Sequence, residues 1–438
     1  MLIQRNLVCL TILGISLVNA NIQSDAVESE LERSNDEQRS RKFVRQGDIL
    51  LTMDEAHAFI GGKDLNRHKR QAQRRNASNE NLWVDGVKYV FDPKTSKKLI
   101  DGFTLAANAW QKDTCINFTL VKSVKEVEGK DYLYVTYDDK HRDECSSHVG
   151  KLGKYQPIFL GDGCESFVHA AHEVGHALGL YHTQSRHDRD QYIELQEHNI
   201  QKKGLAGEFV KFTENQNENY GLPYDYGSIM HYQSPIENPL MIPANENYKT
   251  TMGSPMISFV DLLMINTHYN CTDKCPSETS ADCKNGGFPH PRDCKKCICP
   301  GGYGGALCDQ LPMDCQLGKV LEASSIWNPL EASVQNTKSD GSYATCTYWI
   351  KAPNGKIQIK FGEINNAFRT VGCQRAGVEI KANEDQRLTG YRYCVEPDGI
   401  IESHSNLVPV ILYSKEFFMT FVELQYRYGK LHLFIIVI

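Results

Sequence analysis

Three histidines within a short segment are the strongest chemical signal in the sequence. His172 and His176 are four residues apart, so on an α-helix both imidazoles face the same side and can hold one metal ion. Glu173 lies about 100° around such a helix from His172, where it can take a proton from water without binding the metal. Gly179 allows the chain to turn after the helix, so that His182 completes a three-histidine site with one open position. The pattern predicts a catalytic zinc site with one Zn²⁺ per chain.

Two other readings of the metal ligands explain less of this pattern. His169 lies three residues before His172, but only the register that starts at His172 places a glutamate directly after the first histidine. In another type of zinc enzyme the third ligand is a distant glutamate, and Glu194 and Glu197 lie at a plausible distance. That alternative leaves the glycine and the third histidine of the motif unexplained.

The beginning of the chain is typical of a secretory signal peptide. Arg5 precedes an apolar stretch over residues 7–18, and the segment ends in Val18-Asn19-Ala20. The apolar stretch is shorter than the roughly 20 residues that a membrane span needs. We therefore expect cleavage after Ala20, secretion to the extracellular space and no membrane anchor. Cleavage also removes Cys9, and the even number of cysteines that remains is typical of a fully disulfide-bonded secreted chain.

Composition is ordinary for a globular protein. The 438 residues carry a formal net charge of −6 and no long basic block, which argues against nucleic acid as a partner. Three Asn-X-Ser/Thr triplets, at Asn76, Asn117 and Asn270, are candidate glycosylation sites and fit a secreted protein.

The chain divides into five predicted parts. A signal peptide at 1–20 precedes a polar pro-segment at 21–75, which lacks cysteine and has little apolar periodicity. A large domain at 76–272 mixes helical spacing with strand-like alternation, so its expected fold class is α+β. Six cysteines then crowd into a small module at 273–309, which needs disulfides because it cannot bury enough apolar area. The last part, at 315–430, is expected to be all-β.

Two basic sites close the pro-segment. They are Arg67-His68-Lys69-Arg70 and Arg74-Arg75, and an ordered apolar pattern begins soon afterwards. Their position indicates cleavage by a secretory-pathway protease, after Arg70 or after Arg75, rather than a solvated charge cluster. An activating protease is therefore an expected partner.

A second motif follows the histidines. In Ser228-Ile229-Met230-His231-Tyr232, the methionine alone would be read as core filler, but after a three-histidine motif it matches the Met-turn of metzincins. With residues 172–182, 185–192 and 224–226, this motif gives the chain its resemblance to the astacin family. The order of its parts resembles that of nematode astacin-like proteases with EGF-like and CUB domains.

The resemblance implies a role for each matching residue. His172, His176 and His182 would be the zinc ligands and Glu173 the general base. Tyr232 would be a movable phenol that supports the transition state, and Met230 would form an apolar floor under the imidazoles. The catalytic domain would have a zinc helix and a mixed sheet, followed by an EGF-like module and a CUB sandwich.

The pro-segment carries a partial match to a further motif of this family. Gly47-Asp48 resembles the inhibitory aspartate motif of astacin propeptides, which implies that Asp48 binds the zinc and closes the precursor. Arg45 stands where an aromatic residue usually precedes this pair. A glycine and an aspartate also form ordinary turns, which is the alternative interpretation.

The resemblance also implies the disulfide pairs. They are Cys115–Cys271 and Cys145–Cys164 in the catalytic domain, Cys275–Cys294, Cys283–Cys297 and Cys299–Cys308 in the EGF-like module, and Cys315–Cys346 and Cys373–Cys394 in the CUB domain.

The predicted function is that of a secreted zinc metalloendopeptidase, made as a zymogen, which hydrolyses extracellular proteins. The alternative is an inactive secreted protein that binds partners or matrix through its EGF-like and CUB domains. Such a scaffold has no need for Glu173, which the sequence retains together with every ligand.

Overall fold

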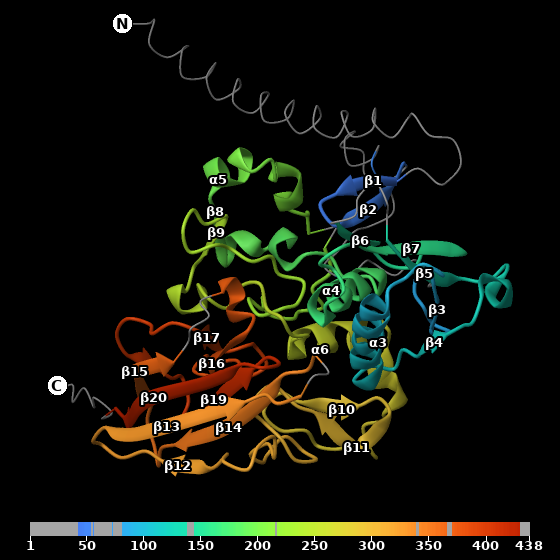
Figure 1. Ribbon diagram of the computed structural model, residues 1–438. Coiled ribbons are helices and arrows are strands. Elements are labelled where there is room, and N and C mark those ends of the chain that lie inside the picture. Colours follow the sequence, from blue (N-terminus) through green and yellow to red (C-terminus); the bar gives the residue numbers. More distant parts are fainter. Residues whose placement is uncertain are drawn as a thin grey trace, which may run out of the picture.

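The structure is a computed structural model that describes residues 43–53, 56, 72, 81–137, 144–214, 217–338, 341–365 and 370–429. The predicted signal peptide, both basic sites, Asn76 and the chain beyond residue 429 lie outside the described residues. An α+β unit, a small disulfide-rich unit and a β-sandwich follow one another along the chain (Figure 1). In the described ranges, no helix has both the length and the apolar character that a membrane crossing requires.

A seven-stranded mixed sheet forms the first layer of the α+β unit, in the order β1-β2-β6-β7-β5-β3-β4. β3, β4, β5 and β7 run parallel, whereas β6 is antiparallel to β7 and accepts β2 as a parallel neighbour on its other side. Valine and aromatic residues, which favour strands, dominate β3 and β5. The strands are β1 (Phe43–Gln46), β2 (Ile49–Thr52), β3 (Val87–Phe91), β4 (Phe118–Leu120), β5 (Tyr132–Thr136), β6 (Cys145–His148) and β7 (Tyr155–Leu160).

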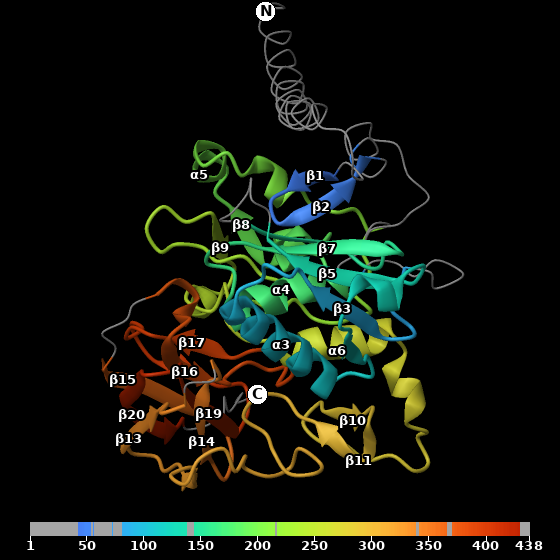
Figure 2. The ribbon, with the colours of Figure 1, turned by 45° about the vertical axis from the view of Figure 1, so that its right-hand side comes forward.

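Two helices, α3 (Lys97–Lys112) and α4 (Phe167–Ala177), cover one face of this sheet (Figure 2). The Ser96 side chain caps α3 by accepting a hydrogen bond from the backbone N–H of Leu99. Phe103 and Trp110 come from the buried face of α3, and both are fully buried. Trp110 also donates a hydrogen bond to the carbonyl of Ala171 at 3.0 Å, which fixes α4 against α3.

The remainder of the α+β unit has little regular structure. It contains α5 (Glu197–Lys202), α6 (Phe259–His268) and the short pair β8 (Ile193–Leu195) and β9 (Met241–Pro243). Short 3₁₀ turns connect these and other elements: η2 (Val124–Val127), η3 (Thr183–Ser185), η4 (Arg189–Gln191), η5 (Ala206–Phe209), η6 (Glu246–Tyr248), η7 (Cys271–Lys274) and η8 (Val371–Cys373).

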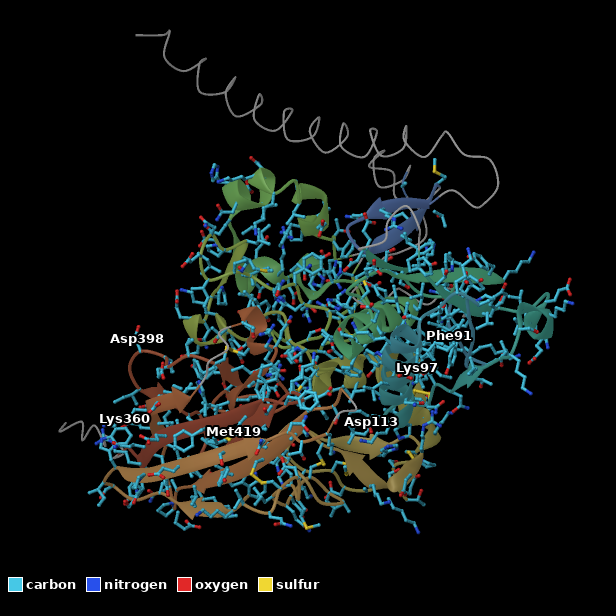
Figure 3. All side chains as sticks on the ribbon, viewed as in Figure 1. Phe91, Lys97, Asp113, Lys360, Asp398 and Met419 are labelled. Atoms are coloured by element: carbon cyan, nitrogen blue, oxygen red, sulfur yellow. A yellow bond between two sulfur atoms is a disulfide. The ribbon has the colours of Figure 1, made fainter. Side chains whose placement is uncertain are left out.

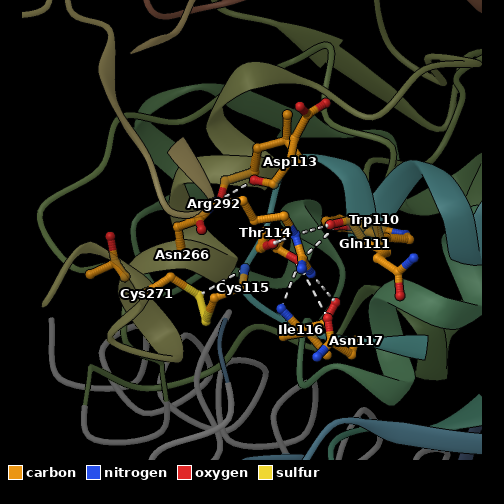
Figure 4. Close-up of a disulfide and its surroundings, with 12 residues drawn as sticks. Trp110, Gln111, Asp113, Thr114, Cys115, Ile116, Asn117, Asn266, Cys271 and Arg292 are labelled. Carbon is orange, nitrogen blue, oxygen red and sulfur yellow. Dashed lines mark hydrogen bonds between the residues drawn. A yellow bond between two sulfur atoms is a disulfide. The ribbon is translucent and has the colours of Figure 1, made fainter. Parts of the chain in front are cut away.

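The small unit contains the hairpin β10 (Phe288–His290) and β11 (Asp293–Ile298). Arg292, at its turn, donates hydrogen bonds to the α+β unit, beside the Cys115–Cys271 disulfide (Figure 4). The acceptors are the carbonyls of Gln111, Thr114 and Ile116 and the side-chain oxygen of Asn117, all at 2.8–2.9 Å. One guanidinium therefore holds the small unit to the end of α3.

Two sheets form the β-sandwich, in the orders β12-β14-β19-β16-β17 and β13-β20-β15-β18. Inward-facing residues such as Ile357, Ile359, Val408 and Val410 are almost fully buried between them. Figure 3 labels Lys360 and Met419 on the second sheet. The strands are β12 (Val320–Glu322), β13 (Asn328–Gln335), β14 (Ala344–Lys351), β15 (Ile357–Asn365), β16 (Ala376–Ile380), β17 (Tyr391–Tyr393), β18 (Ile401–Glu402), β19 (Leu407–Ser414) and β20 (Met419–Tyr428).

The sandwich packs against the α+β unit through a mostly buried interface. Tyr391 of the sandwich contacts the ring of Tyr248, with centroids 4.8 Å apart, and Tyr248 stacks on Tyr226 at 4.2 Å. Thr389 donates hydrogen bonds from its backbone and its side chain to the two carboxylate oxygens of Asp225. Thr389 and Asp225 are both buried, and apolar residues of the two units pack into one continuous core.

The fold confirms the predicted mixture of helix and sheet and differs in detail. The zinc-motif helix α4 ends at Ala177, because Gly179 adopts a left-handed φ of 108° and turns the chain. Strands β1 and β2 of the pro-segment were not predicted, because the apolar run Ile49-Leu50-Leu51 is too short to stand out. The domain boundaries stay predictions.

Seven disulfides occur among the residues that the structure describes, and they join the pairs that the resemblance implied: Cys115–Cys271, Cys145–Cys164, Cys275–Cys294, Cys283–Cys297, Cys299–Cys308, Cys315–Cys346 and Cys373–Cys394.

Candidate metal centre

Helix α4 and the turn after it bring the three histidines together. His172 and His176 lie one turn apart on α4. After the helix, the backbone N–H of Leu180 bonds to the carbonyl of Gly175 at 3.0 Å, and the chain reverses through Gly179. This reversal returns His182 to the same side as the two helical histidines.

The Nε2 atoms of the three imidazoles converge on one point. Nε2 of His182 lies 3.3 Å from Nε2 of His172 and 3.2 Å from Nε2 of His176. A tetrahedral zinc with Zn–N distances of roughly 2.0–2.1 Å needs nitrogen atoms about 3.3 Å apart. The spacing therefore fits a zinc ion.

Backbone carbonyls orient two of the imidazoles. Nδ1 of His172 lies 2.7 Å from the carbonyl of Ile229, and Nδ1 of His176 lies 2.7 Å from the carbonyl of Leu180. A proton on each Nδ1 leaves Nε2 as the metal-binding atom. Burial lowers the pKa of His176 to about 4, so this imidazole is held in the neutral form that binds metals.

Asp48 of the pro-segment lies against the same point. Its carboxylate oxygens are 3.1 Å from Nε2 of His172, 2.9 Å from Nε2 of His182 and 3.7 Å from Nε2 of His176. Burial alone would raise the pKa of Asp48, but the charge of His182 and the contacts with all three histidines hold it well below its usual range. Among the residues that the structure describes, these four form the one group suited to hold a metal ion.

Glu173 faces this group without joining it. Its side chain is 1% exposed, and its Oε2 atom is buried without a hydrogen-bond partner in the structure. Burial, followed by the nearby charge of Asp48, raises the pKa of Glu173 well above its ordinary value. A carboxylate with a raised pKa and an unused oxygen is suited to exchange protons with water. Glu194 and Glu197, the alternative third ligands, are exposed and lie outside the metal-binding group.

The Met-turn packs against α4, the helix that carries two of the histidines. Met230 is fully buried, and its Sδ atom lies 2.6 Å from the position that a Cβ on Gly175 would take, so only glycine fits there. Asp261 of α6 holds this turn by accepting hydrogen bonds from the hydroxyl of Ser228 at 2.5 Å and the backbone N–H of Ile229 at 2.9 Å.

Tyr232 follows the Met-turn and reaches the metal centre. Its ring lies 4.3 Å from the ring of His182, and its hydroxyl donates a hydrogen bond to Asp48 at 3.2 Å. Gln184 fixes the backbone of Tyr232 by accepting its N–H at 3.0 Å. The structure therefore brings every predicted zinc-site residue together, and their individual roles stay predictions.

Two acidic residues near the predicted pro-segment were missed by sequence reasoning. Glu208 of η5 lies close enough to Tyr232 for its charge to help burial raise the pKa of the phenol, and Glu144 pairs with Arg45 of the predicted pro-segment. Neither belongs to a motif, and each is far in sequence from the residues that it meets. The only signal in the sequence that pointed to an acidic partner was Arg45, which stands where an aromatic residue usually precedes the Gly-Asp pair.

Several known proteins are similar to this chain. The profile of the astacin peptidase family matches residues 75–270. Zinc metalloproteinase nas-31 of Caenorhabditis elegans is 40% identical over 409 residues, which cover 88% of this chain and 63% of that protein. Zinc metalloproteinase nas-25 of the same organism is 34% identical over 402 residues, which cover 88% of this chain and 96% of that protein. The chain belongs to the astacin family.

Among solved structures, High choriolytic enzyme 1, a hatching enzyme zinc-protease from medaka (Oryzias latipes), is 28% identical. It covers 45% of this chain and 98% of its own, with a TM-score of 0.39. Astacins are zinc metalloendopeptidases, and the group of Asp48, His172, His176 and His182 is a possible site for the zinc of this one.

Proposed function

We propose that this astacin is secreted as a zymogen and, once activated, hydrolyses peptide bonds of extracellular proteins with one zinc ion per chain. The observation that carries the proposal is the convergence of three imidazole Nε2 atoms beside the buried, unpartnered oxygen of Glu173. A site built only for structure would have no use for that carboxylate.

The chemistry assigns a separate role to each residue. His172, His176 and His182 would hold zinc, which when bound supplies a Lewis acid that activates water and polarises the scissile carbonyl. Glu173 takes a proton from the attacking water and returns it to the leaving amine. Tyr232 donates a hydrogen bond to the oxyanion that develops on the carbonyl. No covalent intermediate is needed.

The remaining parts serve secretion and substrate recognition in this proposal. We assign the small disulfide-rich unit as EGF-like and the sandwich as a CUB domain, supported by their disulfides and by the two packed sheets of the latter. Asn117 and Asn270 are exposed and would accept glycans. A secretory-pathway protease would cut after Arg70 or Arg75.

Replacing Glu173 by glutamine tests the proposed reaction. The Glu173→Gln variant should keep about one zinc per chain, by metal analysis, and lose roughly three decades of peptidase activity because the base is gone. Glu194→Gln serves as the control, since Glu194 is exposed, and should behave like wild type. Activity near wild type in Glu173→Gln would exclude the mechanism. A zinc-loaded, processed wild-type enzyme that cleaves no protein would favour the inactive binding protein instead.

The contacts of Asp48 support its role as the group that closes the precursor. A carboxylate on the three histidines takes the place of the water that Glu173 must activate. With Arg70 and Arg75 replaced to prevent processing, the precursor should be silent, and the same precursor with Asp48→Ala should cleave peptides. Adding Glu173→Gln should abolish that activity again. A folded, zinc-loaded Asp48→Ala precursor without activity would show that another group closes the cleft.

A further inference from the structure

The pro-segment places an arginine against two residues of the catalytic unit. The guanidinium of Arg45 forms an ion pair with Glu144 and lies over the ring of Phe159, 5.4 Å from its centroid. Only 18% of the Arg45 side chain is exposed. A carboxylate and an aromatic face together form a binding place for a basic side chain.

A second carboxylate approaches the pro-segment one residue before Asp48. A Cβ built on Gly47 would lie 2.8 Å from Cδ and 3.0 Å from Oε2 of Glu208. Since Asp48 occupies the metal centre, where a scissile carbonyl must lie, the position of Gly47 corresponds to a residue beside the scissile bond.

Activation removes the pro-segment residues that contact Glu144 and Glu208. When the pro-segment leaves, Arg45 and Asp48 leave with it, while Glu144, Phe159 and Glu208 remain part of the enzyme. A substrate takes the same cleft. A Lys or Arg side chain can then replace Arg45 on Glu144, whereas an acidic side chain would meet like charge.

We propose that Glu144 with Phe159, and Glu208, form an acidic specificity site that selects substrates with Lys or Arg close to the scissile bond. This inference rests on the proposed peptidase function. The Gly47 contact shows how the site works at the nearest position. The three atoms nearest to that space all belong to the flexible end of Glu208, so a substrate side chain can move it aside and a basic one can pair with it.

Peptide series test the preference directly. Activated enzyme is given otherwise identical peptides that carry Lys, Ala or Glu at each of the positions flanking the scissile bond. We expect kcat/KM to favour Lys over Glu by roughly tenfold to a hundredfold at one position or more, as charge-assisted contacts allow. Glu144→Gln and Glu208→Gln should each reduce the preference about tenfold at different positions. Glu197→Gln, an exposed residue with the same change of charge, should leave it unchanged.

Binding gives a second measurement that needs no turnover. In processed Glu173→Gln enzyme, calorimetry should show that a Lys-containing peptide binds roughly tenfold more tightly than its Glu counterpart, and that Glu144→Gln removes the difference. Equal affinity for both peptides, or a peptide series without charge preference, would overturn the inference. A wild-type enzyme that cleaves no peptide but binds Lys peptides through Glu144 would instead contradict the proposed reaction and leave the acidic site standing.

Discussion

The hydroxyl of Tyr232 has two carboxylate neighbours in the precursor, Asp48 and Glu208. Burial and these negative charges raise the pKa of the phenol well above its ordinary value, so its proton is retained for donation. In the proposed activation Asp48 leaves with the pro-segment, and the hydroxyl would become available to an oxyanion at the place that Asp48 occupied. One side chain would then serve both the closed precursor and the proposed reaction.

Tyr232→Phe should therefore lower kcat by roughly ten- to a thousandfold with a smaller change in KM, because the lost hydrogen bond acts in the transition state. Steady-state kinetics of the processed enzyme measure both constants. If KM rose while kcat stayed constant, the phenol would bind substrate instead.

At the scale of single residues, the sequence allowed us to predict the contacts that depend on spacing within one short segment. His172, Glu173, His176 and His182 lie on one helix and the turn after it, so their convergence follows from helix geometry. Glu208 could not be predicted, because its approach to Tyr232 depends on where the tertiary fold places η5. No residue spacing within one element encodes that contact.

Helix α6 connects the Met-turn to the body of the enzyme through Asp261. Its carboxylate accepts the backbone N–H of Ser258, which forms the capping box of α6, and also the N–H of Ile229 in the Met-turn. The same residue therefore caps a helix and anchors the Met-turn, the predicted floor of the metal centre.

The pH dependence of stability should report on Asp261. Burial raises its pKa to about 6 from an ordinary value of 3.8, so the native state binds more protons than the unfolded state between these values. Stability then falls as pH rises through this window, by roughly 3 kcal/mol in total. Urea unfolding of precursor from pH 4 to 7 should show this fall relative to Asp261→Asn, which does not titrate. Parallel pH profiles for the two proteins would contradict the assignment.

The pro-segment shows why some elements escape sequence reasoning. β2 is stabilised by pairing with β6, through contacts such as Ile49 with Ser147, and not by its own four residues. Strand formation by addition to an existing sheet edge depends on the partner. The Gly-Asp pair could be recognised in the sequence, whereas the flanking strands β1 and β2 could not be predicted from it.

For the whole molecule, the main feature is the polar interface between sandwich and peptidase. Asp225 is buried and comes shortly before the Met-turn in the sequence. It accepts two hydrogen bonds from Thr389 of the sandwich. Buried Lys381 lies close enough to favour the charged form of Asp225, while burial raises the pKa of that carboxyl overall. The sandwich therefore completes a buried network that begins in the catalytic unit.

Thr389→Val keeps the shape of the side chain and removes its hydroxyl, which leaves part of the Asp225 carboxylate without a donor. The cost should be about 1–3 kcal/mol of unfolding free energy. Denaturant titration of the precursor measures it, and Thr389→Ser, which retains the hydroxyl, should recover most of the loss. Equal stability of the valine variant and wild type would show that the contact is dispensable.

The interface itself lay beyond prediction from the sequence. Thr389 and Asp225 are far apart in the chain, and neither stands in a pattern that distinguishes an interface residue from a surface one. Arg292, which fixes the small unit to α3, is equally inconspicuous in the sequence. Composition and cysteine spacing indicate separate modules, but the docking of modules depends on surfaces that only the folded units create.

The tyrosines at this interface give the molecule an optical property. The rings of Tyr192, Tyr224, Tyr226, Tyr248 and Tyr391 follow one another with centroids 4.2–5.1 Å apart, and the last step crosses from peptidase to sandwich. Aromatic rings held in a fixed, asymmetric packing produce near-ultraviolet circular dichroism, which disappears when the packing is lost. Separation of the two units would interrupt the row at Tyr391, so the docked and undocked states differ in their spectrum without any added label.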